Sequence, residues 1–274
     1  MRLQRSETGA AAQVTTAVQL GVGGKVMLAL LLTTIGGYVD AVGYIALFQV
    51  FTANMSGNSI HIGMYLSQRD WPNLLRPFCA VVSYVVGMLL TRVAIAIAAR
   101  AGITRVASFT FAVEAVLLVC FARATPAMHL GQLVELHSPA YFGFVAVLAF
   151  AMGVQTATLT SFGALTVYTT FVTGTLTKMT ESIARAFFWA WDQLRQTGIS
   201  DVVRTASGQK DVRQSVMLAS VWTAYVAGAA LGALAKVRWE LRALYVPVAV
   251  FILLIALDRI RPLDVEEERR QTAS

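Results

Sequence analysis

The sequence predicts an all-α integral membrane protein, a polytopic bundle of transmembrane helices built as two pseudo-symmetric halves. Hydrophobic residues make up 57% of the chain and charged residues only 14%. Soluble domains carry about 25% charged residues, so this chain has too few charges for a surface that faces water. Its apolar residues also gather in runs long enough to cross a bilayer, which takes about 20 residues. A polar segment that occurs twice predicts the two halves.

Six apolar runs are predicted to span the membrane: residues 26–48, 78–99, 103–122, 140–165, 215–235 and 243–259. The segments 49–68 and 168–191 are more polar, and they would raise the number of spans to eight if both crossed. Residues 69–77 contain two prolines and two arginines, and we expect them to form a surface turn.

The segment 51–58 (FTANMSGN) follows the first apolar run, and the segment 168–175 (YTTFVTGT) repeats its pattern 117 positions later (168 − 51). In transporters, helix breaks at matching positions of two repeats form the solute site. We therefore expect solute-binding residues at these segments and beside them: Asp40, Thr52, Asn54, Ser56, Gly57, Asn58, Gln155, Thr169, Thr173, Gly174 and Thr175. The alternative is that these groups only join helices, at about 0.6 kcal/mol for each contact.

Two acids, Asp40 and Glu114, fall inside apolar runs. A carboxylate at this depth costs a few kcal/mol or more, so it should face the bundle interior, a cavity or a partner. Both acids are candidates for a proton relay. Alternatively, Asp40 is a structural acid bonded to hydroxyls or amides of a neighbouring helix, and Glu114 pairs with a cation such as Arg92.

Further matches extend the repeat. Residues 84–87 (YVVG) match residues 225–228 (YVAG) at an offset of 141, and residues 116–123 (VLLVCFAR) resemble residues 252–259 (ILLIALDR). The difference of 24 between the two offsets (141 − 117) falls in the basic loop 192–214, where an insertion costs little. At the offset of 117, Asp40 aligns with Ala157. Only the first half therefore carries an acid at this position, and the two halves form no carboxylate pair. The halves are inverted if each has three spans and parallel if each has four.

The predicted organisation follows from these boundaries. An N-terminal tail (1–24) precedes the first membrane repeat (25–123), an inter-repeat loop (124–139), the second membrane repeat (140–262) with the basic loop 192–214, and a C-terminal tail (263–274). Because Lys and Arg favour the cytoplasmic side, we expect the basic loop and both termini to be cytoplasmic. The spacing of Gly228 and Gly232 suits close helix packing, either within the fold or between the copies of a homo-oligomer.

Other classes of function find little support. Cys79 and Cys120 lie in apolar surroundings without a CxxC or Cys/His spacing, so we expect no metal and no cofactor. The sequence contains no arrangement of a nucleophile and a base that would indicate an enzyme. The net charge is +7, but the basic residues lie between apolar runs, which indicates a lipid bilayer and not a nucleic acid as the partner. We expect a carrier for a small solute; the alternative is a non-transporting membrane scaffold or regulatory subunit.

Four stretches resemble the YoaK-like family of bacterial membrane proteins: residues 37–44 (GYVDAVGY), 50–58 (VFTANMSGN), 151–157 (AMGVQTA) and 169–176 (TTFVTGTL). Ser56 stands where the family usually has threonine, a change that keeps the hydroxyl group. The resemblance covers residues 26–260. It implies a multi-pass protein of the bacterial inner membrane without an established activity, and it names no solute.

Overall fold

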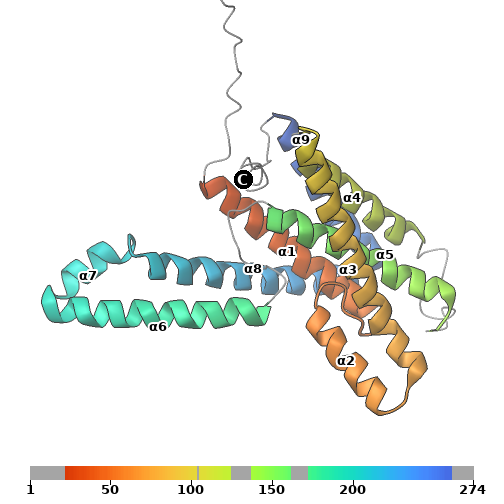
Figure 1. The fold of residues 1–274 in the computed structure, drawn as a ribbon, viewed down its shortest axis with the longest axis horizontal. Helices are drawn as coiled ribbons and strands as arrows, with labels where there is room; N and C mark the ends of the chain where they lie inside the picture. Colours follow the sequence, from red (N-terminus) through yellow and green to blue (C-terminus); the bar gives the residue numbers. More distant parts are fainter. Residues whose placement is uncertain (1–21, 104, 125–136, 162–171, 261–274) are drawn as a thin grey trace, which may run out of the picture.

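The computed structural model describes residues 22–103, 105–124, 137–161 and 172–260, and within these ranges the chain forms helices and turns without a strand. The helices are α1 (Val22–Ala46), α2 (Met55–Ser67), α3 (Trp71–Arg100), α4 (Val106–Ala124), α5 (Pro139–Ser161), α6 (Val172–Gln196), α7 (Ile199–Ala206), α8 (Lys210–Trp239), the 3-10 turn η1 (Glu240–Leu244) and α9 (Tyr245–Ile260) (Figure 1). The helical bundle that the sequence predicts is therefore confirmed.

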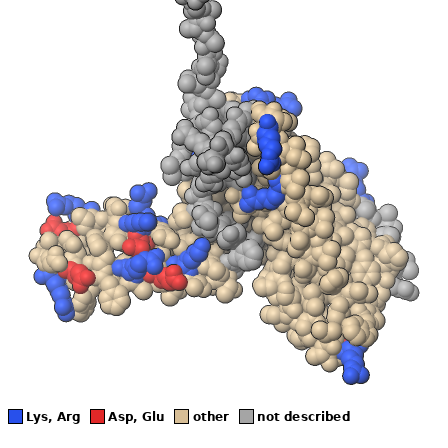
Figure 2. Space-filling view, viewed as in Figure 1, with Lys and Arg blue, Asp and Glu red and all other residues tan. Residues whose placement is uncertain are grey.

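Five helical stretches of the described chain are long and apolar enough to cross a membrane. Four of them belong to α1, α3, α4 and α5, and the fifth covers α8, η1 and α9 together. In the face shown in Figure 2, acidic side chains appear only on the projection formed by α6, α7 and the first part of α8, whereas the charged side chains visible on the bundle are lysines and arginines. This distribution fits a bundle surrounded by lipid.

Two pairs of long helices form the centre of the bundle, α1 with α8 and α3 with α5. Glycines allow the backbones to touch where the helices cross. A Cβ atom at Gly228 would lie 2.0 Å from the Thr34 carbonyl oxygen, and one at Gly87 would lie 2.4 Å from the Phe150 carbonyl oxygen. Gly232 meets α1 in the same way, so the GxxxG spacing serves packing within the chain.

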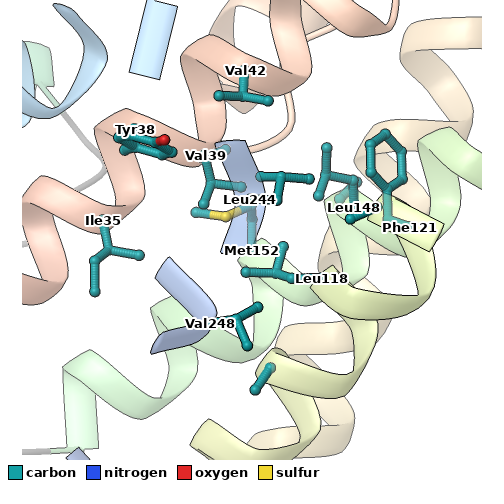
Figure 3. Close-up of a cluster of buried hydrophobic side chains, with 14 of the residues drawn as sticks. Ile35, Tyr38, Val39, Val42, Leu118, Phe121, Leu148, Met152, Leu244 and Val248 are labelled. Atoms are coloured by element: carbon teal, nitrogen blue, oxygen red, sulfur yellow. The ribbon is translucent and has the colours of Figure 1, made fainter. Parts of the chain in front are cut away.

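Around these crossings, side chains from α1, α4, α5, η1 and α9 form one apolar core (Figure 3). Val39, Leu118 and Met152 are 0% exposed at its centre. Aromatic contacts extend the core along α4: the Phe111 ring stacks on Phe251, and the Phe121 ring meets Phe144 edge-on. The core thus joins the first half of the chain to the second.

Two of the polar segments between the predicted spans contain helices, α2 and α6. α2 has 13 residues and is therefore only about 20 Å long, short of the roughly 30 Å hydrocarbon core. α2 packs against α3, and α6 packs against α8. Residues 192–214, predicted as a basic loop, are the end of α6, the whole of α7 and the start of α8. That prediction was wrong because charge marked the segment as a loop, whereas the charges lie on helices. Asp211 of α8 bonds to Arg185 of α6 at 2.8 Å, and Arg204 pairs with Asp201 within α7.

The predicted surface turn at 69–77 is also wrong for most of its length. Asp70 caps α3 by accepting a hydrogen bond from the Asn73 backbone amide at 3.3 Å, so the helix begins at Trp71. Proline is compatible with the first turn of a helix, where its missing N–H would have no helical partner. Arg76 and Pro77 are consequently helical and buried.

α3 and α8 are equally long, with 30 residues each. They contain the matched segments 84–87 (YVVG) and 225–228 (YVAG).

A glycine-to-alanine pair on α5 tests the helix crossings. A Cβ atom at Gly153 would lie 2.2 Å from the Tyr84 carbonyl oxygen, whereas one at Gly143 would have nothing within 4 Å. We expect Gly153→Ala to lower the thermal unfolding temperature of the detergent-purified protein because α3 and α5 must separate. Gly143→Ala should leave it unchanged or raise it slightly, since alanine favours a helix by about 1 kcal/mol over glycine. Equal unfolding temperatures for the two variants would contradict the crossing.

Candidate functional site

The first polar segment forms a break between two helices. α1 ends at Ala46 and α2 begins at Met55. Between them, Phe48 and Gln49 adopt left-handed backbone conformations with φ angles of 50° and 68°. Left-handed backbone is costly for residues other than glycine, so other contacts must hold this break in place.

Asp40 supplies the central contact of the break. One carboxylate oxygen accepts hydrogen bonds from the Thr52 amide at 2.8 Å, the Ala53 amide at 2.8 Å and the Thr52 hydroxyl at 3.0 Å. The other oxygen accepts a hydrogen bond from the Tyr225 hydroxyl of α8 at 2.7 Å. Asp40 is 4% exposed, so these four donors replace water around the carboxylate. This arrangement matches the structural alternative, in which the acid binds the amides and hydroxyls around it.

Two asparagines complete the break. The Asn58 side chain is 0% exposed; it accepts from the Phe51 amide at 3.1 Å and donates to the Phe51 carbonyl oxygen at 2.8 Å. Asn54 caps α2, because its side-chain oxygen accepts from the Gly57 amide at 3.3 Å and from the Ser56 hydroxyl at 2.7 Å. Both asparagines therefore bind the backbone of this segment.

Gln155, on α5, faces the middle of α1. Its side-chain nitrogen donates to the Leu32 carbonyl oxygen at 3.0 Å. Its side-chain oxygen is buried against Gly36 and has no hydrogen-bond partner among the described residues. This buried oxygen belongs to a residue predicted to bind solute, and it can still accept a hydrogen bond.

The second polar segment falls partly outside the described residues, which exclude 162–171 and therefore Thr169. The rest of the segment opens α6. Thr173 and Gly174 are exposed there, and Thr175 is buried at 4% exposure.

Two tyrosines that the sequence analysis did not single out make equivalent contacts. Tyr225 donates to Asp40 across the α1–α8 crossing, and Tyr84 donates to the Thr156 hydroxyl across the α3–α5 crossing, at 2.9 Å. Both tyrosines stand in the matched segments YVVG and YVAG, which was the signal that could have found them. By its contacts, Thr156 corresponds to Asp40, one position before the Ala157 that the ungapped alignment predicts.

Glu114 lies in the apolar core without a partner. It is 0% exposed, and neither carboxyl oxygen has a hydrogen-bond partner among the described residues. The Arg92 guanidinium instead donates to the Thr160 hydroxyl. The predicted Glu114–Arg92 pair is therefore wrong, because neither oxygen of Glu114 bonds to Arg92, which reaches α5 instead.

Asp258, a third buried acid, escaped the sequence analysis because it stands near the end of the last apolar run. It is 0% exposed and accepts a short hydrogen bond from the Ser108 hydroxyl, which ties α9 to α4. Sequence position alone gave it the appearance of a charge at a helix end.

The fold and the buried polar groups define a multi-helix integral membrane protein with a hydrogen-bonded helix break at its centre. Residues 28–257 match the family described as "Protein of unknown function (DUF1275)", and the chain belongs to this family. It is 26% identical to the UPF0700 transmembrane protein YoaK of Bacillus subtilis (strain 168) over 185 residues, which cover 66% of this chain and 75% of that protein. The predicted YoaK-like membership is confirmed. No solved structure matches the chain.

Substitutions at Asp40 test its part in the break. Asp40→Ala leaves two buried amides and two hydroxyls without their acceptor, and an unsatisfied buried group costs about 1–3 kcal/mol. We expect a clear drop in the thermal unfolding temperature of the purified protein. The unfolding temperature of Asp40→Asn should fall less, because the asparagine carbonyl oxygen can still accept hydrogen bonds from the Thr52 and Ala53 amides. Tyr225→Phe removes one bond alone and serves as the control; a smaller loss for Asp40→Ala than for this control would contradict the arrangement.

Proposed function

We propose that this protein is a membrane carrier for a small solute, built from two copies of one broken-helix unit. The observation that carries the proposal is the pair of equivalent crossings. In each crossing a glycine of one helix meets a tyrosine carbonyl of the other, Gly37 with Tyr225 and Gly153 with Tyr84. The residue three positions after each of these glycines, Asp40 or Thr156, accepts a hydrogen bond from the hydroxyl of the same tyrosine.

The helix order supports a duplication. α1, α2 and α3 are followed in the second half by α5, α6 and α8, with α7 as the added piece. α1 packs on α8 and α3 packs on α5, so each half contributes one helix to each crossing. Secondary transporters commonly have this exchange between repeats, with interrupted helices near the repeat interface.

The contacts distribute the roles within the proposed carrier. Asp40 positions the first break, since its four hydrogen bonds hold Thr52, Ala53 and the neighbouring helix α8. The free oxygen of Gln155 is the acceptor offered to solute, and the hydroxyl groups of Ser56, Thr173 and Thr175 flank the starts of α2 and α6. Glu114 is the proton-binding acid, because a buried carboxyl without a partner is accommodated best in its neutral form.

The proposal includes the predicted setting: a bacterial inner membrane, cytoplasmic termini and no enzymatic activity. A scaffold or regulatory subunit is the second candidate. It draws support from the internal satisfaction of the first break, where Asp40 and Asn58 bind the chain itself. The two candidates differ in whether the centre of the bundle opens to water.

Accessibility at Gln155 separates a carrier from a scaffold without knowledge of the solute. We expect Gln155→Cys, in a background with Cys79→Ser and Cys120→Ser, to react with a membrane-impermeant thiol reagent from both sides of the membrane, in right-side-out and inside-out vesicles. Ala149→Cys on the same helix is equally buried and apolar, and it should react from neither side. Reaction from one side only, or from neither side, would argue against alternating access.

Glu114 is tested by proton movement. In proteoliposomes that enclose a pH-sensitive dye, a panel of amino acids, sugars and organic acids should include a solute whose addition changes the internal pH. We expect Glu114→Gln to abolish this change, because an amide cannot take up the proton that a carboxylate carries. Glu240→Gln, at an exposed position of η1, is the matched control and should behave as the wild type. Unchanged proton movement in Glu114→Gln would exclude this role.

A further inference from the structure

Arg76 is a buried cation that the proposed function does not use. It lies in the second turn of α3 and is 8% exposed. Its Nε atom has no hydrogen-bond partner, and the described residues provide no carboxylate within ion-pair distance. A buried charge without a counter-ion is strongly unfavourable.

Arginine and glutamate differ in whether they can lose a buried charge. Glu114 can bind a proton and become neutral, whereas the guanidinium stays charged because it cannot be deprotonated in proteins. None of the described residues offers Arg76 a paired carboxylate, so its guanidinium is suited to bind an external anion. Guanidinium groups bind phosphate and carboxylate through two parallel hydrogen bonds, and the Nε–H is one of the donors in such a fork.

The surroundings of Arg76 add positive potential. Its guanidinium lies beside the Tyr141 hydroxyl in the first turn of α5, where the helix dipole is positive. That hydroxyl donates to the Leu47 carbonyl oxygen at 2.8 Å, so its proton is already used. The site therefore gathers the start of α3, the start of α5 and the end of α1.

The titratable groups around the site leave its charge in place. Asp70 is an acid close enough to Arg76 to feel its charge, but it accepts from the Asn73 side chain at 2.6 Å. This bond is the main reason why the pKa of Asp70 lies below its usual value, and Arg76 and His137 make smaller contributions to that lowering. Asp70 thus serves the helix cap and makes no ion pair with Arg76.

We propose that Arg76 and the positive end of α5 bind the phosphate of an anionic phospholipid headgroup. Trp71, Leu75 and Phe78 flank Arg76 on α3 and are exposed at 58%, 50% and 49%. Exposed aromatic and apolar side chains around a cation at the ends of membrane helices match the level of the headgroups. A lipid supplies both the phosphate for the guanidinium and the acyl chains for these side chains. The site is independent of the carrier proposal, since Arg76 makes no contact with the polar groups assigned there.

Thermal unfolding of the full-length protein in a neutral detergent tests the site. We expect phosphatidylglycerol to raise the unfolding temperature of the wild type by about 5 °C, and phosphatidylcholine to raise it far less. Arg76→Gln should lose this rise. Arg69→Gln removes an exposed arginine from the same end of α3 and should keep it. Without lipid, Arg76→Gln should unfold no earlier than the wild type, because an uncompensated charge has been removed.

Other outcomes would overturn the proposal. An equal rise in Arg76→Gln and the wild type would exclude the residue. A large loss of stability in lipid-free Arg76→Gln, with its response to lipid retained, would make Arg76 a structural residue only. A response to millimolar inorganic phosphate as large as that to phosphatidylglycerol would assign the anion site to soluble phosphate instead. Glu135 belongs to the inter-repeat loop 124–139 and lies outside the described residues. If Glu135→Gln responded to lipid and the wild type did not, Glu135 would be the counter-ion of Arg76.

Discussion

The carboxylate of Asp40 is the interaction on which the centre of this protein depends. A helix that stops inside a membrane leaves backbone amides without partners, and hydrocarbon offers none. Asp40 binds two of these amides and at the same time accepts from a tyrosine of α8. One side chain thus stabilises the break and attaches it to the long helix from the other half of the chain. A charge that would be unfavourable alone becomes favourable because four donors surround it.

The two halves use the same crossings for different purposes. At each crossing a glycine admits the opposite backbone, and a tyrosine hydroxyl reaches a polar residue three positions further on. In one crossing that residue is Asp40, whose carboxylate has capacity left for the broken backbone. In the other crossing that residue is Thr156, whose hydroxyl donates a hydrogen bond to the Met152 carbonyl oxygen in its own helix. The two crossings therefore share one arrangement but place an acid in the first and a neutral hydroxyl in the second.

Much of this fold was predictable because lipid constrains sequences strongly. The apolar runs located the long helices, and the repeated polar segments located the break and Asp40. The less predictable features depend on contacts between distant parts of the chain. The ungapped alignment placed Ala157 opposite Asp40, but a hydrogen bond from Tyr84 assigns that position to Thr156. Charge and proline suggested a surface turn around Arg76, whereas packing on α5 buried it, and composition alone cannot report such packing.

The bond between Asp40 and Tyr225 has a consequence for how the protein is made. The two residues are 185 positions apart. At a synthesis rate of about 5–20 residues per second, the ribosome needs about 10–40 s to produce the tyrosine after the acid. During that interval the Thr52 and Ala53 amides can already bind the carboxylate, but the donor from α8 is missing. The oxygen that later accepts from Tyr225 therefore has no partner from α8 until that helix is made.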